Sequence, residues 1–164
     1  MNTSFKLAAL LVLLATLAGT AGAFTADRLE VVVAEGGDAT VEFQYRMGWL
    51  ESAAVFVGFV RPEMELKRAL EAYSGKEVMV SRVDAGVAAF EVDGFAHVRD
   101  GTVYTTPALS FEEAGTIIRR DYSWLAGLIE TDFSPSVTAI TFPDGFQETF
   151  YDQAEIPRVE HAVQ

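Results

Sequence analysis

A strict alternation of apolar and polar residues over positions 40–47 is the feature that most limits the folds open to this chain. A period of two indicates a β-strand with one buried face and one face in water. A β-branched run at 29–34 comes before it, and turn-forming residues (Gly-Gly-Asp) occupy positions 36–38 between the two runs. Together they predict a β-hairpin. The apolar positions of the second run are Val41, Phe43, Tyr45 and Met47.

The segment 48–73 has apolar residues at helical spacing. Its second half begins with Pro62, which suits the first position of a helix, and Gly75 stands where a glycine commonly ends one. Its first half is apolar nearly all round, which indicates a helix buried against a sheet, a membrane or a partner. We expect Pro62 to kink or break the segment into two parts.

Two further strands are predicted at 77–83 and 87–93, with a short turn between them. The Asp-Gly pair at 93–94 is expected to form a β-bulge, because the alternation resumes beyond it. The Asp-Gly pair at 100–101 is a dipeptide favoured in the type I′ turns of hairpins. A return strand is predicted at 102–106, after this turn. Residues 76–107 therefore predict a three-stranded meander.

A second helix is predicted to begin at Ser110. Ser110 and Glu113 have the spacing of a capping box, in which each side chain accepts a hydrogen bond from a backbone N–H group near the other residue. Helical spacing continues over 111–130, although two glycines weaken it. The alternative is a helix that stops near Arg120 and a strand after it, so both helix and strand remain open for 121–130.

The last predicted elements are a strand at 137–142, a tight turn at 143–145 and a returning strand at 146–151. The residues that follow are polar and contain Pro157, which predicts a loose C-terminal tail from about residue 152. The element order is then ββ–α–βββ–α–ββ. It predicts an α+β fold, in which helices pack on one face of an antiparallel sheet within a single domain over 24–164.

The first 23 residues have the three parts of a secretory signal peptide. Lys6 supplies the positive charge, residues 7–17 form an apolar stretch, and residues 21–23 (Ala-Gly-Ala) fit the small-residue cleavage pattern. The alternative is an uncleaved leader that serves as a membrane anchor, although the apolar stretch is short for a span of about 20 residues. We therefore expect a secreted or cell-surface protein, and membrane contact only through an uncleaved leader.

Charge and cysteine content exclude several functions. Removing the leader takes away Lys6 and no acid, so the net charge changes from −12 to −13. A chain this acidic repels nucleic acid and anionic lipid. The absence of cysteine excludes disulfides, thiolate zinc sites and cysteine nucleophiles.

The sequence contains no recognised catalytic, cofactor-binding or metal-binding motif, and we expect none of these sites. His97 and His161 stand in no metal-ligand spacing, and the Asp-Gly pairs lack the further oxygen ligands of a calcium loop. Glu112 and Glu113 could in principle exchange protons with a substrate, but the capping box and surface exposure explain them.

Three aromatic residues form a weak candidate for a binding surface: Trp49, Tyr122 and Trp124. Exposed aromatic side chains favour interfaces with proteins or glycans. We therefore expect an exported, non-catalytic binding or assembly module whose partner is a protein or glycan at the cell envelope. The alternatives are an exported hydrolase that uses carboxylate acid–base chemistry, and an envelope protein anchored by its leader.

We predict that the mature protein begins at Phe24, immediately after the Ala-Gly-Ala pattern. The measurement is the intact mass of the protein isolated from its native host. A full-length species in the membrane fraction would contradict the prediction and support the anchor.

Overall fold

The computed structural model describes one part of the chain. The leader and the stretch 121–130 lie outside that part, so the predictions for them stay predictions. In the described part, no helix combines the length and apolar character that crossing a bilayer needs. The described residues are 24–46, 64, 67–68, 71, 75–84, 86–112, 116, 131–132 and 134–163.

The first layer, which we call the main sheet, has the strand order β10-β9-β1-β2-β4-β3. Its pairs are antiparallel except that β1 runs parallel to β9 and, at its start, to β8 (Thr131–Asp132). The predicted first hairpin is confirmed as β1 and β2. The six strands are β1 (Phe24–Val33), β2 (Ala39–Arg46), β3 (Val78–Asp84), β4 (Val87–Val92), β9 (Val137–Thr141) and β10 (Gln147–Tyr151).

The second layer is formed by two segments that pair in one register. The first contains β6 (Val103–Thr105) and β7 (Leu109–Ser110), and β5 (His97–Arg99) pairs with β6. The second contains β11 (Glu155–Ile156) and β12 (Glu160–Ala162), which pair antiparallel with β7 and β6. A short gap separates the β6–β12 pairing from the β7–β11 pairing. The register is the same on both sides of this gap, so the two ladders are parts of one interrupted ladder.

Prolines cause the interruption. Pro107 and Pro157 lie within the paired segments, and a proline has no N–H group to donate to a ladder. Thr106 bridges the gap: its N–H donates to the carbonyl of Val159 at 2.9 Å, and its Oγ1 accepts from the N–H of Val159 at 3.1 Å. The Thr106 side chain thus replaces a missing backbone partner, and the ladder keeps its register.

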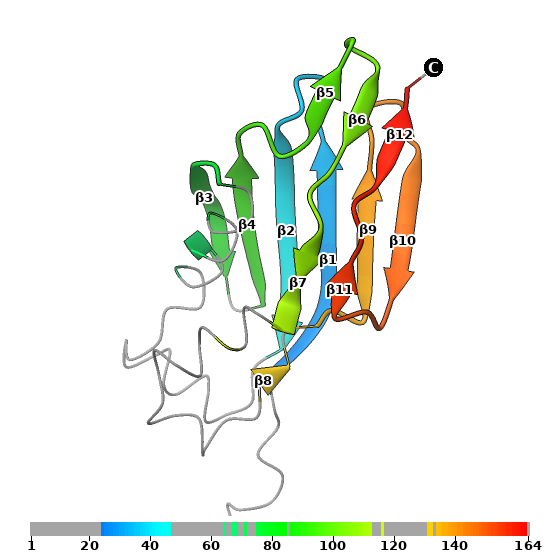
Figure 1. Cartoon of the computed structure of the whole chain (residues 1–164). Helices are drawn as coiled ribbons and strands as arrows, with labels where there is room; N and C mark the ends of the chain where they lie inside the picture. The colour runs from blue at the N-terminus through cyan, green and yellow to red at the C-terminus, as the bar shows by residue number, and fades with distance from the viewer. Residues whose placement is uncertain are drawn as a thin grey trace, which may run out of the picture.

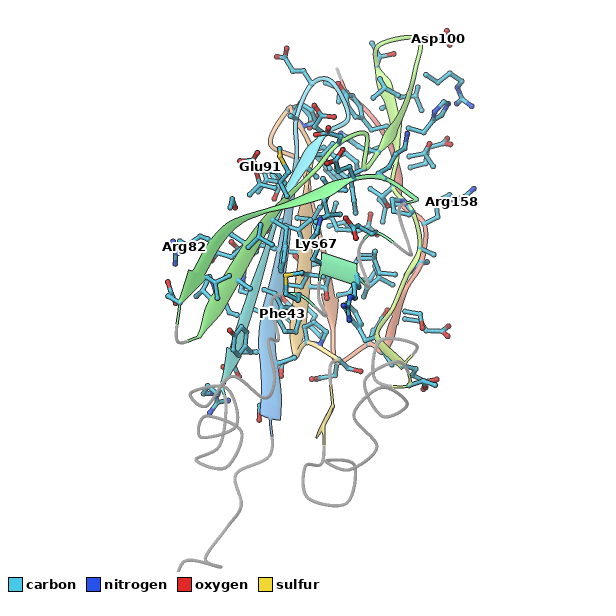
Figure 2. All side chains as sticks on the ribbon, turned by 90° about the vertical axis from the view of Figure 1, so that its left-hand side faces the viewer. Phe43, Lys67, Arg82, Glu91, Asp100 and Arg158 are labelled. Atoms are coloured by element: carbon cyan, nitrogen blue, oxygen red, sulfur yellow. The ribbon has the colours of Figure 1, made fainter. Side chains whose placement is uncertain are left out.

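The core lies between the two layers. Figure 1 shows β5, β6, β7, β11 and β12 over one face of the main sheet, and in the perpendicular view of Figure 2 Arg82 and Glu91 point away from them. Burying one such apolar side chain contributes about 1.5–3 kcal/mol. The main members of this core are Leu29, Val31, Val33, Val41, Phe43, Phe90 and Ile140 from the main sheet, and Tyr104, Leu109, Ile156 and Val159 from the second layer.

The predicted α+β fold is wrong for the described part of the chain. The elements there are strands, and strands rather than helices cover the inner face of the main sheet. The predicted helical segments 48–73 and 111–130 lie mostly outside the described residues. Their described members have helical backbone conformation, but no helix stands among the described elements. These members are Met64, Lys67, Arg68, Glu71, Phe111, Glu112 and Thr116. The covering strands have only two or three residues each, too few for an alternation that the sequence could display.

The predicted meander over 76–107 is also wrong. β3 and β4 pair in the main sheet, but β5 and β6 pair in the second layer, so the chain crosses between layers at 93–96. The expected bulge at 93–94 is a turn that begins this crossing, with Gly94 at φ +58°. The turn at 100–101 is confirmed, because both residues have positive φ and connect β5 to β6.

The C-terminal residues differ from the predicted loose tail. β11 and β12 lie beyond residue 152, and the backbone N–H of Val163 still donates to the carbonyl of Thr102 at 2.9 Å. Ile156 and Val159 are buried in the core. Pro157 interrupts regular pairing here as predicted, but pairing with 102–111 holds the segment on both sides of it. The last predicted hairpin is confirmed as β9 and β10.

The turn between β1 and β2 contacts the crossing segment closely. Gly37 has φ +90°, and a Cβ atom placed on it would lie 2.4 Å from the carbonyl oxygen of Ala96. The N–H of Ala96 donates to the carbonyl of Gly37 at 2.8 Å, and the hydroxyl of Tyr104 donates to the carbonyl of Glu35 at 2.7 Å. Only glycine fits a positive φ at so close an approach.

We predict that Gly37→Ala lowers the free energy of unfolding by more than about 3 kcal/mol, since strain at positive φ adds to a backbone clash. Gly145→Ala is the matched control, because Gly145 has φ +84° but open space around it. It should cost only about 1–2 kcal/mol. Urea unfolding measures both variants, and equal losses would show that the approach of Ala96 is unimportant.

Candidate functional site

The structure leaves the predicted aromatic surface untested. Trp49, Tyr122 and Trp124 all lie outside the described residues. Of the two neighbouring acids considered for proton exchange, Glu112 is exposed and Glu113 lies outside the described part. The remaining candidates for a site are the histidines, the carboxyl groups and the edges of the main sheet.

The two histidines lie on opposite faces of the second layer. His97 is exposed on β5, in the row that contains Thr105 and Glu160 on the neighbouring strands. His161 belongs to the row that contains the buried Tyr104, so it faces the main sheet. The structure does not bring the two histidines together.

His161 joins the second layer to the turn between β9 and β10. Its Nε2 lies 2.8 Å from Oδ2 of Asp144, and these side chains are only 18% and 22% exposed. Its ring stacks on Phe146, with centroids 4.2 Å apart and planes 10° apart, and lies 5.0 Å from the ring of Phe142. These contacts hold β12 against the main sheet.

The same contact sets the charge of Asp144. The hydrogen bond from His161 and the backbone N–H of Phe146, which donates at 3.0 Å, hold the pKa of Asp144 below its ordinary value of 3.8. Asp144 is therefore ionised at neutral pH and serves as a fixed acceptor. The sequence identified its Asp-Gly turn, but it did not show that His161 lies beside it.

The carboxyl groups with altered pKa in the described part are all shifted downward. The hydrogen bond from Arg46, at 2.6 Å, lowers the pKa of Asp27, and the hydrogen bond from Lys67 lowers that of Glu71. A general acid at neutral pH needs the opposite shift, a raised pKa. No group of three potential ligands in the described part could hold a metal ion.

One depression in the described surface lies beside β7 and β11. Glu155 is the one acidic group in its lining, and no histidine or basic side chain lies opposite it. The depression therefore does not pair an acid with a base. It is lined by Ala108, Leu109, Ser110, Glu155, Ile156 and Pro157.

β3, the strand at one end of the main sheet, has three features that protect an edge from pairing. Lys67 Nζ donates to the carbonyl of Val78, and the N–H of Val78 donates to the carboxylate of Glu71, so two side chains occupy the backbone groups of one residue. A bulge interrupts the strand between Val80 and Arg82. Charged side chains and bulges are common protections of this kind.

The charged end of β3 adds to this protection. Arg82 and Asp84 are more than half exposed and pair with each other at 3.1 Å. A strand that approached this end would have to accommodate both charges. β3 also exposes Met79, Val80 and Val83, which are 37–51% exposed, so it is apolar but protected.

β10, the strand at the other end, lacks these features. Its pairing with β9 contains no bulge, it has no proline, and Glu148 is its one charged residue. Tyr151 is 67% exposed, and Phe146, just before the strand, is 44% exposed. Among the described strands β10 pairs with β9 alone.

The hydrogen-bonding pattern between β9 and β10, which we call the backbone phase of β10, shows which backbone groups of β10 point away from β9. The N–H of Phe142 donates to the carbonyl of Phe146, and the N–H of Asp152 donates to the carbonyl of Ser136. Hydrogen-bonded and non-bonded pairs alternate along an antiparallel ladder. It follows that the N–H and C=O groups of Gln147, Thr149 and Tyr151 point away from β9. We call this side of the strand the β10 edge.

The β10 edge is our candidate site, and no motif in the sequence predicts it. The returning strand was predicted, and its lack of proline and its single charge could have indicated an unprotected edge. Its position at the end of the sheet could not be predicted.

Comparison with protein-family models, with curated proteins and with solved structures gave no match for this chain.

We predict that Asp144→Asn destabilises the protein at about pH 6 and that the difference from wild type shrinks as the pH falls below 3.8. The folded-state pKa of Asp144 is lowered, so its contribution is present above 3.8 and is lost as the pH falls through the folded-state value. Denaturant unfolding across this range measures the difference. Asp100→Asn, in the Asp-Gly turn between β5 and β6, controls for loss of a negative charge. A difference that stays constant down to the lowest pH would show that ionisation of Asp144 does not stabilise the fold.

Proposed function

We propose that this chain is an exported, non-catalytic binding or assembly module that takes a partner β-strand on the β10 edge. The observation that carries the proposal is the difference between the two ends of the main sheet. β3 is protected by the Lys67 and Glu71 contacts, a bulge and charges, whereas the residues that the structure describes give β10 no comparable protection. Natural sheets protect edges that must stay unpaired. An unprotected edge is therefore the place where a partner belongs.

The affinity of such a site comes from main-chain hydrogen bonds. An added strand pairs with the outward N–H and C=O groups at positions 147, 149 and 151, while its side chains contact those of β10. Tyr151, at 67%, is the most exposed of the large hydrophobic residues that the structure describes, and aromatic side chains contribute strongly to interfaces. Strand addition favours a protein over a glycan as the partner.

Export is supported by the leader, in which Lys6, the apolar stretch 7–17 and the Ala-Gly-Ala pattern at 21–23 occur in order. The mature net charge of −13 also disfavours nucleic acid and anionic lipid as partners.

The absence of a catalytic role is supported by the electrostatics of the acids. Asp27, Glu71 and Asp144 are each held ionised by a cationic or hydrogen-bonding neighbour. Such groups are suited to structural contacts and poorly suited to general acid catalysis.

We predict that a photo-reactive phenylalanine analogue at Tyr151 forms a covalent adduct with a protein in the native host, and that the same analogue at Met79 does not. Met79 is the matched control, because it is 51% exposed on the protected end strand β3. Mass spectrometry identifies the adduct. Equal adducts from both positions, or none from Tyr151, would contradict the proposed β10 site. Turnover of ester, glycoside or peptide substrates by the purified protein, lost on substitution of one acid, would contradict the non-catalytic role.

A further inference from the structure

We infer that the partner strand is the β10 of a second copy of this chain, paired antiparallel about a twofold axis at Thr149. The inference rests on the proposed function and specifies its partner. It follows from the backbone phase of β10, the positions of its side chains and the protection of β3.

The backbone phase selects the register. The outward groups of β10 belong to Gln147, Thr149 and Tyr151. With the axis at Thr149, Thr149 of each copy faces Thr149 of the other copy. Gln147 of each copy then faces Tyr151 of the other. Each of these pairs exchanges both backbone hydrogen bonds. An axis at Glu148 or Phe150 would leave one of the three outward residues without a partner in each copy.

The side chains favour the same register. An axis at Thr149 places Glu148 opposite Phe150 of the copy, so no like charges face each other. An axis at Glu148 would place two carboxylates directly opposite, which is destabilising. On the other face, Gln147 lies opposite the exposed ring of Tyr151, and two β-branched threonines meet at the axis. The strand is thus complementary to itself in the register that its backbone prefers.

The protected end explains why such an assembly would stop at two copies. A twofold contact uses the same surface on both subunits and closes the assembly. The dimer then has a β3 strand at each end of one continuous sheet. The contacts of Val78 with Lys67 and Glu71, the bulge and the charges all disfavour further addition there. Repulsion between two acidic copies is screened beyond about 8 Å at physiological ionic strength.

The absence of cysteine allows a direct test of the register. In Thr149→Cys the two sulfur-bearing residues would lie opposite each other, at a Cα separation of about 5.5 Å that a disulfide can span. In Gln147→Cys, on the same face of the same strand, the two residues would be displaced by four positions, roughly 13 Å along the strands. Under mild oxidation of the chain as isolated from its host, we expect Thr149→Cys to form covalent dimers at least about tenfold faster. Equal rates would overturn the proposed register.

Sedimentation equilibrium tests the dimer without a cross-link. The wild-type chain should sediment as a dimer at micromolar concentration. The Thr149→Lys substitution should raise the dissociation constant of the dimer at least about tenfold, because two lysines would face each other at the axis. Thr40→Lys is the matched control, since Thr40 is exposed on the central strand β2 of the same sheet, and it should leave the constant unchanged. Unfolding curves of both variants check that the fold is intact.

The outcomes separate this inference from the proposed function. A monomeric wild-type chain, or equal effects of the two lysine variants, overturns the inference. If the adduct at Tyr151 then contains a different protein, the binding role of the β10 edge stands and the second copy is excluded. If the adduct contains a second copy of this chain, both are supported.

Discussion

The inner face of the main sheet has to be kept from water by packing alone, because the chain has no cysteine that could cross-link its layers. The cover consists of two short segments joined in one ladder, whose register Thr106 preserves across Pro107 and Pro157. His161 fastens the end of this ladder to the turn between β9 and β10. The core, the second layer and the end of the main sheet therefore depend on one another.

The ends of the sheet follow from a second constraint, which is that backbone hydrogen-bonding groups need partners. At β3 the protein satisfies Val78 with side chains of Lys67 and Glu71 and limits the remaining edge with a bulge. At β10 three residues have outward backbone groups that no described strand satisfies. An edge strand is a risk for aggregation, and this contrast between the two ends is the basis of the partner proposed at β10. A symmetric dimer would occupy the unprotected end and leave only the protected one.

The candidate site could be predicted only in part. The returning strand of β10 and the Asp-Gly turn before it were visible as local patterns, because alternation and turn chemistry involve neighbouring residues. The contact between Asp144 and His161 could not be predicted, since a ladder formed by residues far apart in the chain brings them together. The predicted aromatic surface at Trp49, Tyr122 and Trp124 remains a prediction.

Local sequence patterns were sufficient to predict four hairpins with short turns: β1 with β2, β3 with β4, β5 with β6, and β9 with β10. In each case a turn dipeptide or tripeptide sets a pairing that closes a short loop at small entropic cost. Long-range packing and pairing set three further features: β1 lies parallel to β9, the chain crosses between layers at 93–96, and β11 and β12 cover the core. Those pairings join distant segments, and several involve strands of two or three residues. Burial of the shared core and long-range backbone bonds select their register, and neither leaves a pattern in the local sequence.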